Sequence, residues 1–213
     1  MANKNSAGFG LIPSRVLGQS PATAGYGQYW IDNADSTAIY NGEAVYSLVG
    51  SITGAQGSAT TVTLGVLQGV FYNAATTNKP TWSNYFAGSI TPANSEDIKA
   101  FVYDNPFQIY RCGTDAAVAA TVVLAHEELF ETFGFNTTSG STATGKSNAT
   151  LNIGATHATN DTWKFLGSAE DPENEDLITT PQTDPSLANF SGYASVVVVV
   201  NKSQWFGTGT VGA

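Results

Sequence analysis

Five consecutive valines, at positions 196–200, place the tightest limit on how this chain can fold. Ser195 and Asn201 bound the run, and no polar residue alternates with the valines inside it. A β-branched run of this length is typical of a strand, and a strand without alternation is expected to be covered on both faces. Such strands lie in the middle of a β-sandwich or barrel. The run therefore predicts a core built from sheets.

Segments rich in β-branched and aromatic residues recur along the rest of the chain, with turn-forming residues between them. This pattern predicts many short strands. Gly65 and Gly69 fall inside one of these segments and indicate a bulge or bend, as found where a barrel turns a corner. The expected strands are 27–31, 44–49, 60–72, 97–104, 107–112, 119–124, 149–153, 162–166 and 194–201.

One short helix is expected at 125–133. Acidic residues lie in its first turn, and Gly134 follows its end, where a left-handed cap is common. Two loops stand out, a flexible neutral one at 136–145 and an acidic one at 170–176. The predicted fold class is mainly β, an antiparallel β-barrel or sandwich with an extended N-terminal arm and one short helix.

The chain has few charged residues, and its N-terminal segment differs in the sign of its charge from the rest. Charged residues make up 12% of the chain, and the formal net charge is −9. Residues 1–31 hold Lys4 and Arg15 and no acidic residue, so subtracting these two positive charges leaves −11 on the remainder. A body this acidic repels phosphate backbones, and nucleic-acid binding through charge is not expected.

The chain has one cysteine, Cys112, which excludes an internal disulfide. Its start lacks the basic region and apolar run of a signal peptide, and no stretch approaches the roughly 18 apolar residues of a membrane span. We therefore expect a protein made and folded in a cytoplasm, without membrane contact. With 42% hydrophobic residues in 213, the chain is long enough to bury a substantial core.

The two histidines do not predict a catalytic or metal site. His126 and Glu127 begin like the zinc-protease helix motif, but Phe130 stands where the second histidine is required. His157 falls in a different loop. Loop or helix-cap histidines are the simpler interpretation, and we expect no metal and no cofactor.

Cysteine and carboxylate chemistry is equally weakly supported. Arg111 precedes Cys112, but no base lies nearby in the sequence, so a small buried side chain is the simpler interpretation. The five carboxylates at 170–176 lack the spacing of a calcium-binding hand, which leaves only a loose cation site as an alternative to a solvated loop. An enzyme is not expected.

Residues 1–25 are interpreted as an arm, and residues 26–213 as one β domain. Glycines and prolines spaced through the arm exclude a regular helix. Docking on another subunit, as an added strand or a strap, would satisfy the arm's backbone, and deleting residues 1–20 is then expected to leave a folded body. The alternative is that the segment forms an edge strand on the protein's own sheet. We consider this as good an interpretation as docking for residues 25–31, and a weaker one for the first twenty residues. The expected docking residues are Lys4, Phe9, Leu11, Ile12, Arg15 and Leu17.

Several segments carry a resemblance that runs over most of the chain. They are 1–15 (MANKNSAGFGLIPSR), 17–21 (LGQSP), 64–72 (LGVLQGVFY), 79–85 (KPTWSNY), 97–106 (DIKAFVYDNP) and 166–175 (LGSAEDPENE). These segments resemble small virion structural proteins of tailed bacteriophages, many of them from marine phages. Proteins of that kind are taken to be capsid-associated, as head decoration or cement proteins.

The resemblance implies a cement protein on the surface of a virion capsid, bound across neighbouring major capsid protein subunits. It carries over no catalytic residue. A homotrimer is the expected self-association, because local threefold positions on a capsid present three equivalent surfaces. Trp82, Tyr85 and Phe86 form an aromatic segment that is poor in charge, and it is either an interface anchor or an ordinary core cluster.

Two other functions stay open. The chain could occupy a different structural place in the virion, as a subunit of the tail tube, a head-tail component or the major capsid protein, although it is short for a capsid shell protein. It could instead be a carbohydrate-binding module for host attachment, in which hydroxyl-rich loops and exposed aromatic side chains hold a sugar.

Overall fold

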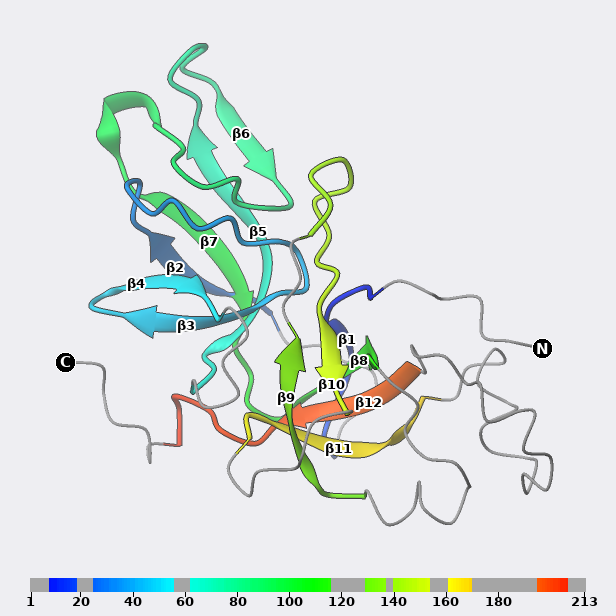
Figure 1. The fold of residues 1–213 in the computed structure, drawn as a ribbon. Coiled ribbons are helices and arrows are strands. Elements are labelled where there is room, and N and C mark those ends of the chain that lie inside the picture. The colour runs from blue at the N-terminus through cyan, green and yellow to red at the C-terminus, as the bar shows by residue number, and fades with distance from the viewer. Residues whose placement is uncertain are drawn as a thin grey trace.

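The computed structural model describes residues 8–18, 25–55, 62–115, 129–136, 140–153, 161–169 and 195–206. Twelve β-strands and one short 3-10 turn, η1 (Ala93–Ser95), lie within these ranges. The strands form two antiparallel sheets, shown in Figure 1 with one sheet at the upper left and the other below it. The prediction of a mainly β, antiparallel fold is therefore confirmed.

Sheet I has the strand order β2-β7-β5-β3-β4, and β6 also pairs with β5. The strands are β2 (Gly27–Ile31), β3 (Ala44–Leu48), β4 (Ser51–Gly54), β5 (Gly65–Asn73), β6 (Pro80–Ser83) and β7 (Ile98–Tyr103). The first and last strands in the order, β2 and β4, lie next to each other. Sheet I is therefore curled around one apolar cluster, called cluster I here: Ile31, Ile39, Val45, Ile52, Leu64, Leu67, Val70, Phe86, Ile98, Ala100 and Val102.

Sheet II has the strand order β1-β8-β12-β11-β9-β10. Its strands are β1 (Ile12–Val16), β8 (Gln108–Gly113), β9 (Thr132–Asn136), β10 (Thr150–Asn152), β11 (Trp163–Ser168) and β12 (Ser195–Val200). The sheet closes on itself, because Leu151 of β10 forms a bridge with Thr114 just after β8, and the amide of Gly10 donates to the carbonyl of Ala149 at 3.1 Å. A second apolar cluster, with Tyr110, Phe133 and Trp163 among its largest members, fills sheet II.

The valine run is a central strand, as predicted. β12 lies between β8 and β11 and pairs with both. Val196 and Val198 are buried in the second cluster, whereas Val197, Val199 and Val200 are partly exposed. We expected both faces of this strand to be fully buried, and this is wrong for one of them. The face that carries Val197 and Val199 is only partly covered by the described residues.

The bulge predicted from the glycines of 60–72 is present. The register between β5 and β7 shifts between Leu67 and Gly69, and β5 begins at Gly65. Because of the shift, the outward positions of β5 change along its length: Val66 packs in the second cluster below the bulge, and Phe71 is exposed beyond it.

The helix expected at 125–133 is wrong in the part that the structure describes. Leu129 and Phe130 form a turn, and Thr132–Asn136 is strand β9, paired with both β10 and β11. Residues 125–128 lie outside the described residues, as do the strand expected at 119–124 and the acidic loop at 170–176. Strand β9 was not predicted because it lacks the alternation of buried and exposed residues that marks a half-buried strand. Four of its five residues are buried.

The loop at 136–145 is not free in its described part. Residues 140–145 fold over sheet I, where the amide of Asn41 donates to the carbonyl of Gly145 at 2.9 Å. The side-chain amide of Asn84 donates to the carbonyl of Thr144 at 2.6 Å. Figure 1 shows this connection between β9 and β10 rising from sheet II to the side of sheet I. The described part of this loop is therefore held to sheet I by hydrogen bonds.

The β3–β4 hairpin turns through Val49 and Gly50, which both have positive φ, 47° and 86°. A two-residue turn with two positive φ angles matches the twist of the flanking strands but favours Asn-Gly. Val49 is β-branched and 85% exposed. It therefore bears backbone strain that burial does not offset.

Replacing Val49 by Asn is expected to stabilise the protein by about 1 kcal/mol, because Asn tolerates the left-handed conformation. Thermal or denaturant unfolding measures the change. Val49→Thr keeps the β-branch and serves as the control, with no comparable gain. Equal stability of Val49→Asn and the parent protein would show that the turn is not strained.

Candidate functional site

Sheet I carries a row of aromatic side chains on the face that points away from cluster I. Trp30 of β2 pairs with Lys99 of β7, and Lys99 pairs on its other side with Phe71 of β5. Phe71 pairs in turn with Trp82 of β6. Directly opposed residues of antiparallel strands project from the same face, so these side chains form one row across four strands. The Lys99 ammonium lies 5.6 Å from the centre of the Trp30 ring, a cation–π distance.

A second row lies two residues further along β7. Phe101 shares the outward face with Lys99, and its partner on β5 is Gly69. The Trp82 ring fills the space that a side chain at position 69 would take, since a Cβ built there would lie 2.5 Å from the indole. Trp82 therefore reaches Phe101, with ring centres 5.2 Å apart. The glycine at the bulge allows the two rows to join.

Two tyrosines extend the surface toward sheet II. The ring centre of Tyr26 lies 6.5 Å from Phe101 and 5.0 Å from Tyr103, both in edge-on geometry. Tyr26, Trp30 and Trp82 are about half exposed, at 50%, 50% and 52%. We call this surface the aromatic face, and its members are Tyr26, Trp30, Phe71, Trp82, Phe101 and Tyr103. Clustered, partly exposed rings on a paired sheet are typical of a binding surface.

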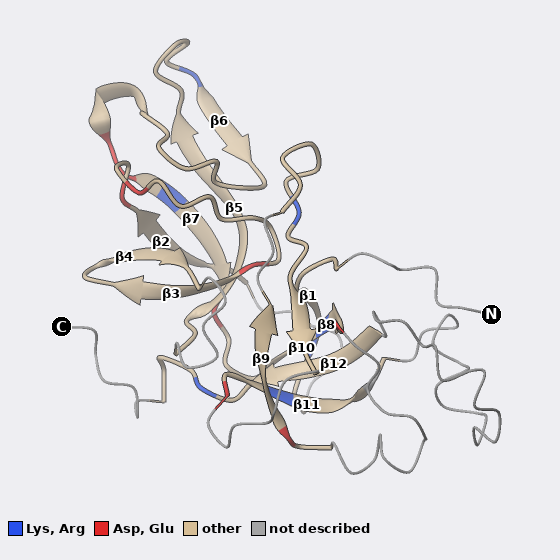
Figure 2. Ribbon diagram, viewed as in Figure 1, with Lys and Arg blue, Asp and Glu red and all other residues tan. Residues whose placement is uncertain are grey.

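The aromatic face is almost neutral. Its members surround a single described charge, Lys99, and Figure 2 shows β5 and β6 without acidic or basic residues. Burial raises the pKa of Tyr103 to about 12, and its hydrogen bond with Tyr26 adds to the effect. The Tyr103 phenol therefore stays neutral at physiological pH. Binding on this face depends on apolar contact more than on ion pairs.

A pocket of about 260 Å³ adjoins the aromatic face at Tyr103. Its lining includes Phe9 and Pro13 of the arm, Asn41, and Gln68 of β5. Most of its lining is apolar, and Tyr103 and Lys146 are the titratable side chains among the lining residues. It extends the aromatic face toward the arm.

Residues 40–44 lead into β3 of sheet I and hydrogen-bond to the arm and to the β9–β10 connection, and they are called the junction turn. The amide of Gly42 donates to the carbonyl of Leu67 at 2.9 Å, and the amide of Leu67 donates back to the carbonyl of Glu43 at 2.9 Å. From the arm, the amide of Leu11 donates to the carbonyl of Gly42 at 2.8 Å. Gly42 has φ 82°, and a Cβ there would lie 3.2 Å from the Leu11 backbone, so the close approach requires glycine.

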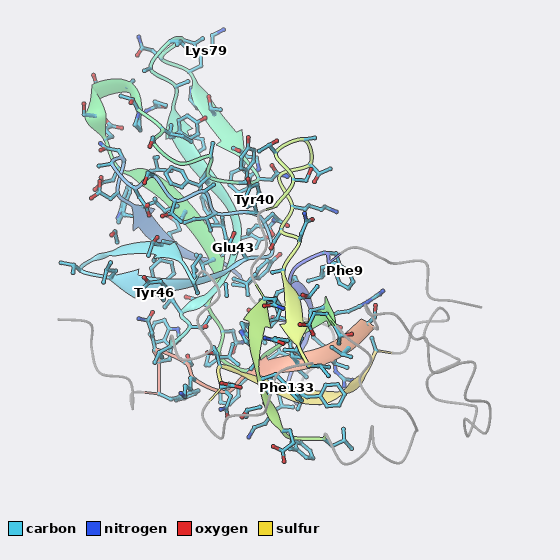
Figure 3. All side chains as sticks on the ribbon, in the orientation of Figure 1. Phe9, Tyr40, Glu43, Tyr46, Lys79 and Phe133 are labelled. Atoms are coloured by element: carbon cyan, nitrogen blue, oxygen red, sulfur yellow. The ribbon has the colours of Figure 1, made fainter. Side chains whose placement is uncertain are left out.

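Glu43 is a buried acid in this turn, with 2% of its surface exposed. Figure 3 shows Tyr40 and Glu43 at the junction between the sheets. The carboxylate Oε2 accepts the amide of Tyr40 at 2.9 Å, and Oε1 is buried without a hydrogen-bond partner. Burial raises the pKa of Glu43 from 4.5 to about 7, and the bond from Tyr40 offsets only part of that effect.

The structure corrects the interpretation of the arm for residues 8–18. β1 is an edge strand of sheet II, paired with β8, and Leu11 and Val16 are buried in the protein's own core. These two side chains are therefore not free to dock on another subunit, and deleting residues 1–20 would remove part of the core. The pairing with β8 provides backbone hydrogen bonds to the arm within its own chain. This is the edge-strand alternative, which the sequence favours less for the first twenty residues than for 25–31.

The other predicted arm residues have different positions. Phe9 is partly buried and lies under Arg111, with the guanidinium 5.7 Å from the ring centre. Ile12, Arg15 and Leu17 are exposed. Lys4 lies outside the described residues. Three of the six predicted docking residues thus remain at the surface.

The three predicted aromatics separate into different roles. Trp82 is part of the aromatic face, whereas Phe86 is fully buried in cluster I. Tyr85 stacks on Tyr40, with ring centres 5.5 Å apart and an angle of 2° between the planes. Cys112 is buried, and burial raises the pKa of its thiol, as expected for a packed side chain. His126 and His157 lie outside the described residues.

The sequence analysis did not identify Trp30, Phe71 or Phe101 as a surface. The alternation of Lys99 and Phe101 with buried residues in 97–104 was a usable signal for β7. No sequence signal places Trp30 beside Lys99, because that contact depends on how strands far apart in the chain pair. Glu43 carries no motif at all.

Comparison with protein-family models, curated proteins and solved structures finds no match. Within the described residues, no cluster of three or more metal-binding side chains occurs, and no helix has the length and apolar character to cross a bilayer. The function is therefore argued from the surface of this chain.

Gly69→Ala is expected to displace Trp82 and to destabilise the protein by about 1–3 kcal/mol, because the added methyl meets both the indole and the carbonyl of Ser83. Near-ultraviolet circular dichroism and unfolding measure the two effects. Gly113→Ala is the matched control, since its methyl would meet the Phe9 ring at an ordinary 3.5 Å. An unchanged aromatic spectrum for Gly69→Ala would contradict this packing.

Glu43 is expected to make the protein less stable as the pH rises. The unfolded chain loses this proton near pH 4.5 and the folded protein near pH 7, so the contribution of Glu43 is complete below 4.5. It falls between these values by at most about 1.4 kcal/mol per pH unit. The difference in unfolding free energy between wild type and Glu43→Gln measures the slope, and exposed Glu96→Gln is the control. A difference independent of pH from 4.5 to 7 would contradict the assignment.

Proposed function

We propose that this protein is a cement protein of a tailed-phage capsid, attached across neighbouring major capsid protein subunits. The resemblance of its sequence segments suggests the setting, and the aromatic face is the observation that carries the proposal. A cement protein acts by burying surface across subunit junctions, and it needs a preformed apolar patch on a rigid body. The face offers that patch on four hydrogen-bonded strands.

The composition of the face favours a protein partner. Tryptophan and tyrosine are the side chains most often dominant in protein interfaces, and charged side chains are depleted at their centres. Trp30 and Trp82 lie at opposite ends of one row, with Lys99 as the only described charge between them. The ordered strands also lower the entropy lost on binding.

The arm has a different role in this proposal from the one expected of it. Its described part supplies an edge strand and core residues, and only the exposed Ile12, Arg15 and Leu17 remain for contact with a partner. A homotrimer stays the proposed assembly, because three copies around a local threefold position would each present one aromatic face to the shell. The same face would serve a subunit placed elsewhere in the virion.

Carbohydrate binding is the second candidate. The half-exposed rings of Trp30 and Trp82 are platforms on which sugar rings could stack, and the pocket beside Tyr103 would add polar contacts from Gln68. The row between the two tryptophans is apolar apart from Lys99, so a protein partner is preferred.

Trp30→Ala and Trp82→Ala are each expected to weaken attachment to phage heads that lack this subunit by about 30-fold, as for a hot-spot side chain. Cosedimentation with purified heads measures occupancy. Trp205→Ala removes an equally exposed tryptophan outside the face and serves as the control. Full occupancy by both face variants would overturn the proposal. Binding of a glycan array that is lost in the same variants would favour the second candidate instead.

A further inference from the structure

The carboxyl group of Glu43 occupies a position that favours its neutral form. One oxygen has a single hydrogen bond, from the amide of Tyr40, and the other has none. Around it lie the Ile39 side chain and Gly54 of β4, with Oε1 3.0 Å from a Cβ built on Gly54. An ionised carboxylate with one donor in such surroundings is strongly disfavoured relative to water.

No described charge compensates the carboxylate. Burial and the Tyr40 amide are the causes of its shift, and no charged side chain is among them. The elements packed against it contribute apolar or backbone groups: Ile39 before the turn, Gly54 from β4, and the amide of Leu67 from β5, which bonds to the carbonyl of Glu43 itself. Tyr40 is the one titratable side chain among these neighbours, and its ring is stacked on Tyr85.

The junction turn also holds segments from elsewhere in the chain. Gly42 accepts the amide of Leu11 from the arm. Asn41 donates its amide to Gly145 and accepts the amide of Ser147, both at 2.9 Å, which ties the β9–β10 connection to sheet I. Movement of Glu43 toward water therefore requires movement of the backbone that anchors both segments.

We propose that Glu43 is a proton-operated latch on the junction between the two sheets: the neutral carboxyl keeps the junction turn closed, and the ionised carboxylate favours an open turn. In the open state the bonds from Leu11 and Ser147 are broken together, and the arm and the β9–β10 connection loosen from sheet I. The latch requires no partner and is independent of the proposed cement function. It makes the rigidity of the junction sensitive to pH near neutrality.

Amide hydrogen exchange at Leu11, Gly42 and Ser147 tests the latch in the full-length protein. After correction for the intrinsic pH dependence of exchange, the opening equilibrium is expected to rise roughly 30-fold from pH 5.5 to pH 8, given ionisation near 4.5 when open and near 7 when closed. Amides in the centre of β12 exchange through global unfolding, which Glu43 also makes dependent on pH, so they serve as a reference for the level of opening. At each pH the three junction amides are expected to show a larger opening equilibrium than the β12 amides, and equal values would mean that the junction opens only when the whole protein unfolds.

Glu43→Gln cannot ionise, and it is expected to abolish the rise at all three amides, whereas exposed Glu96→Gln is expected to retain it. Persistence of the full rise in Glu43→Gln would overturn the proposal. If that variant fails to fold, carbon NMR titration of the Glu43 carboxyl in the wild type decides the question. Ionisation near pH 7 together with the rise would support the latch, and ionisation near 4.5 would overturn it.

Discussion

The architecture depends on the hydrogen bonds of the junction turn. Through this turn the arm, β5 and the β9–β10 connection meet at one backbone segment, so two curled sheets with separate apolar clusters become one body. Ala44 packs in the second cluster and Val45 in cluster I, which places adjacent residues of one strand in the two cores. Glycine at 42 permits this arrangement, because any side chain there would push the arm away.

The aromatic face exists because the outward side of sheet I is covered along only part of its length. Near the junction, the outward side of β5 is covered by the second cluster through Val66. Beyond the bulge at Gly69 there is no such cover among the described residues, and the outward positions carry large rings instead. Aromatic contact along β7 and across to β6 holds these rings in place, which makes them a surface prepared for binding. The proposed function uses this surface and leaves the buried carboxyl of Glu43 as a separate feature.

Residues with clear local patterns were predictable. The expected strands at 27–31, 97–104 and 194–201 correspond closely to β2, β7 and β12, because alternation or unbroken apolar character is visible over short stretches. The site was harder to predict. Trp82 was identified from its aromatic neighbours, yet Phe86, four residues later, is in the core, since only the three-dimensional path of the chain separates exposed from buried rings. The segment 132–136 was misassigned because a short strand buried on both sides resembles the end of an apolar helix.

The sequence by itself determined a β-rich body with a central valine strand, a bulge in β5 and a single buried cysteine, because these depend on local preferences and on apolar content. Tertiary structure alone decided that the arm completes sheet II, that six aromatic side chains share one face, and that Glu43 lies buried in the junction turn. Each of these depends on pairing between residues far apart in the chain. Such pairing is selected by the total burial and hydrogen bonding of the folded body, which no short segment encodes.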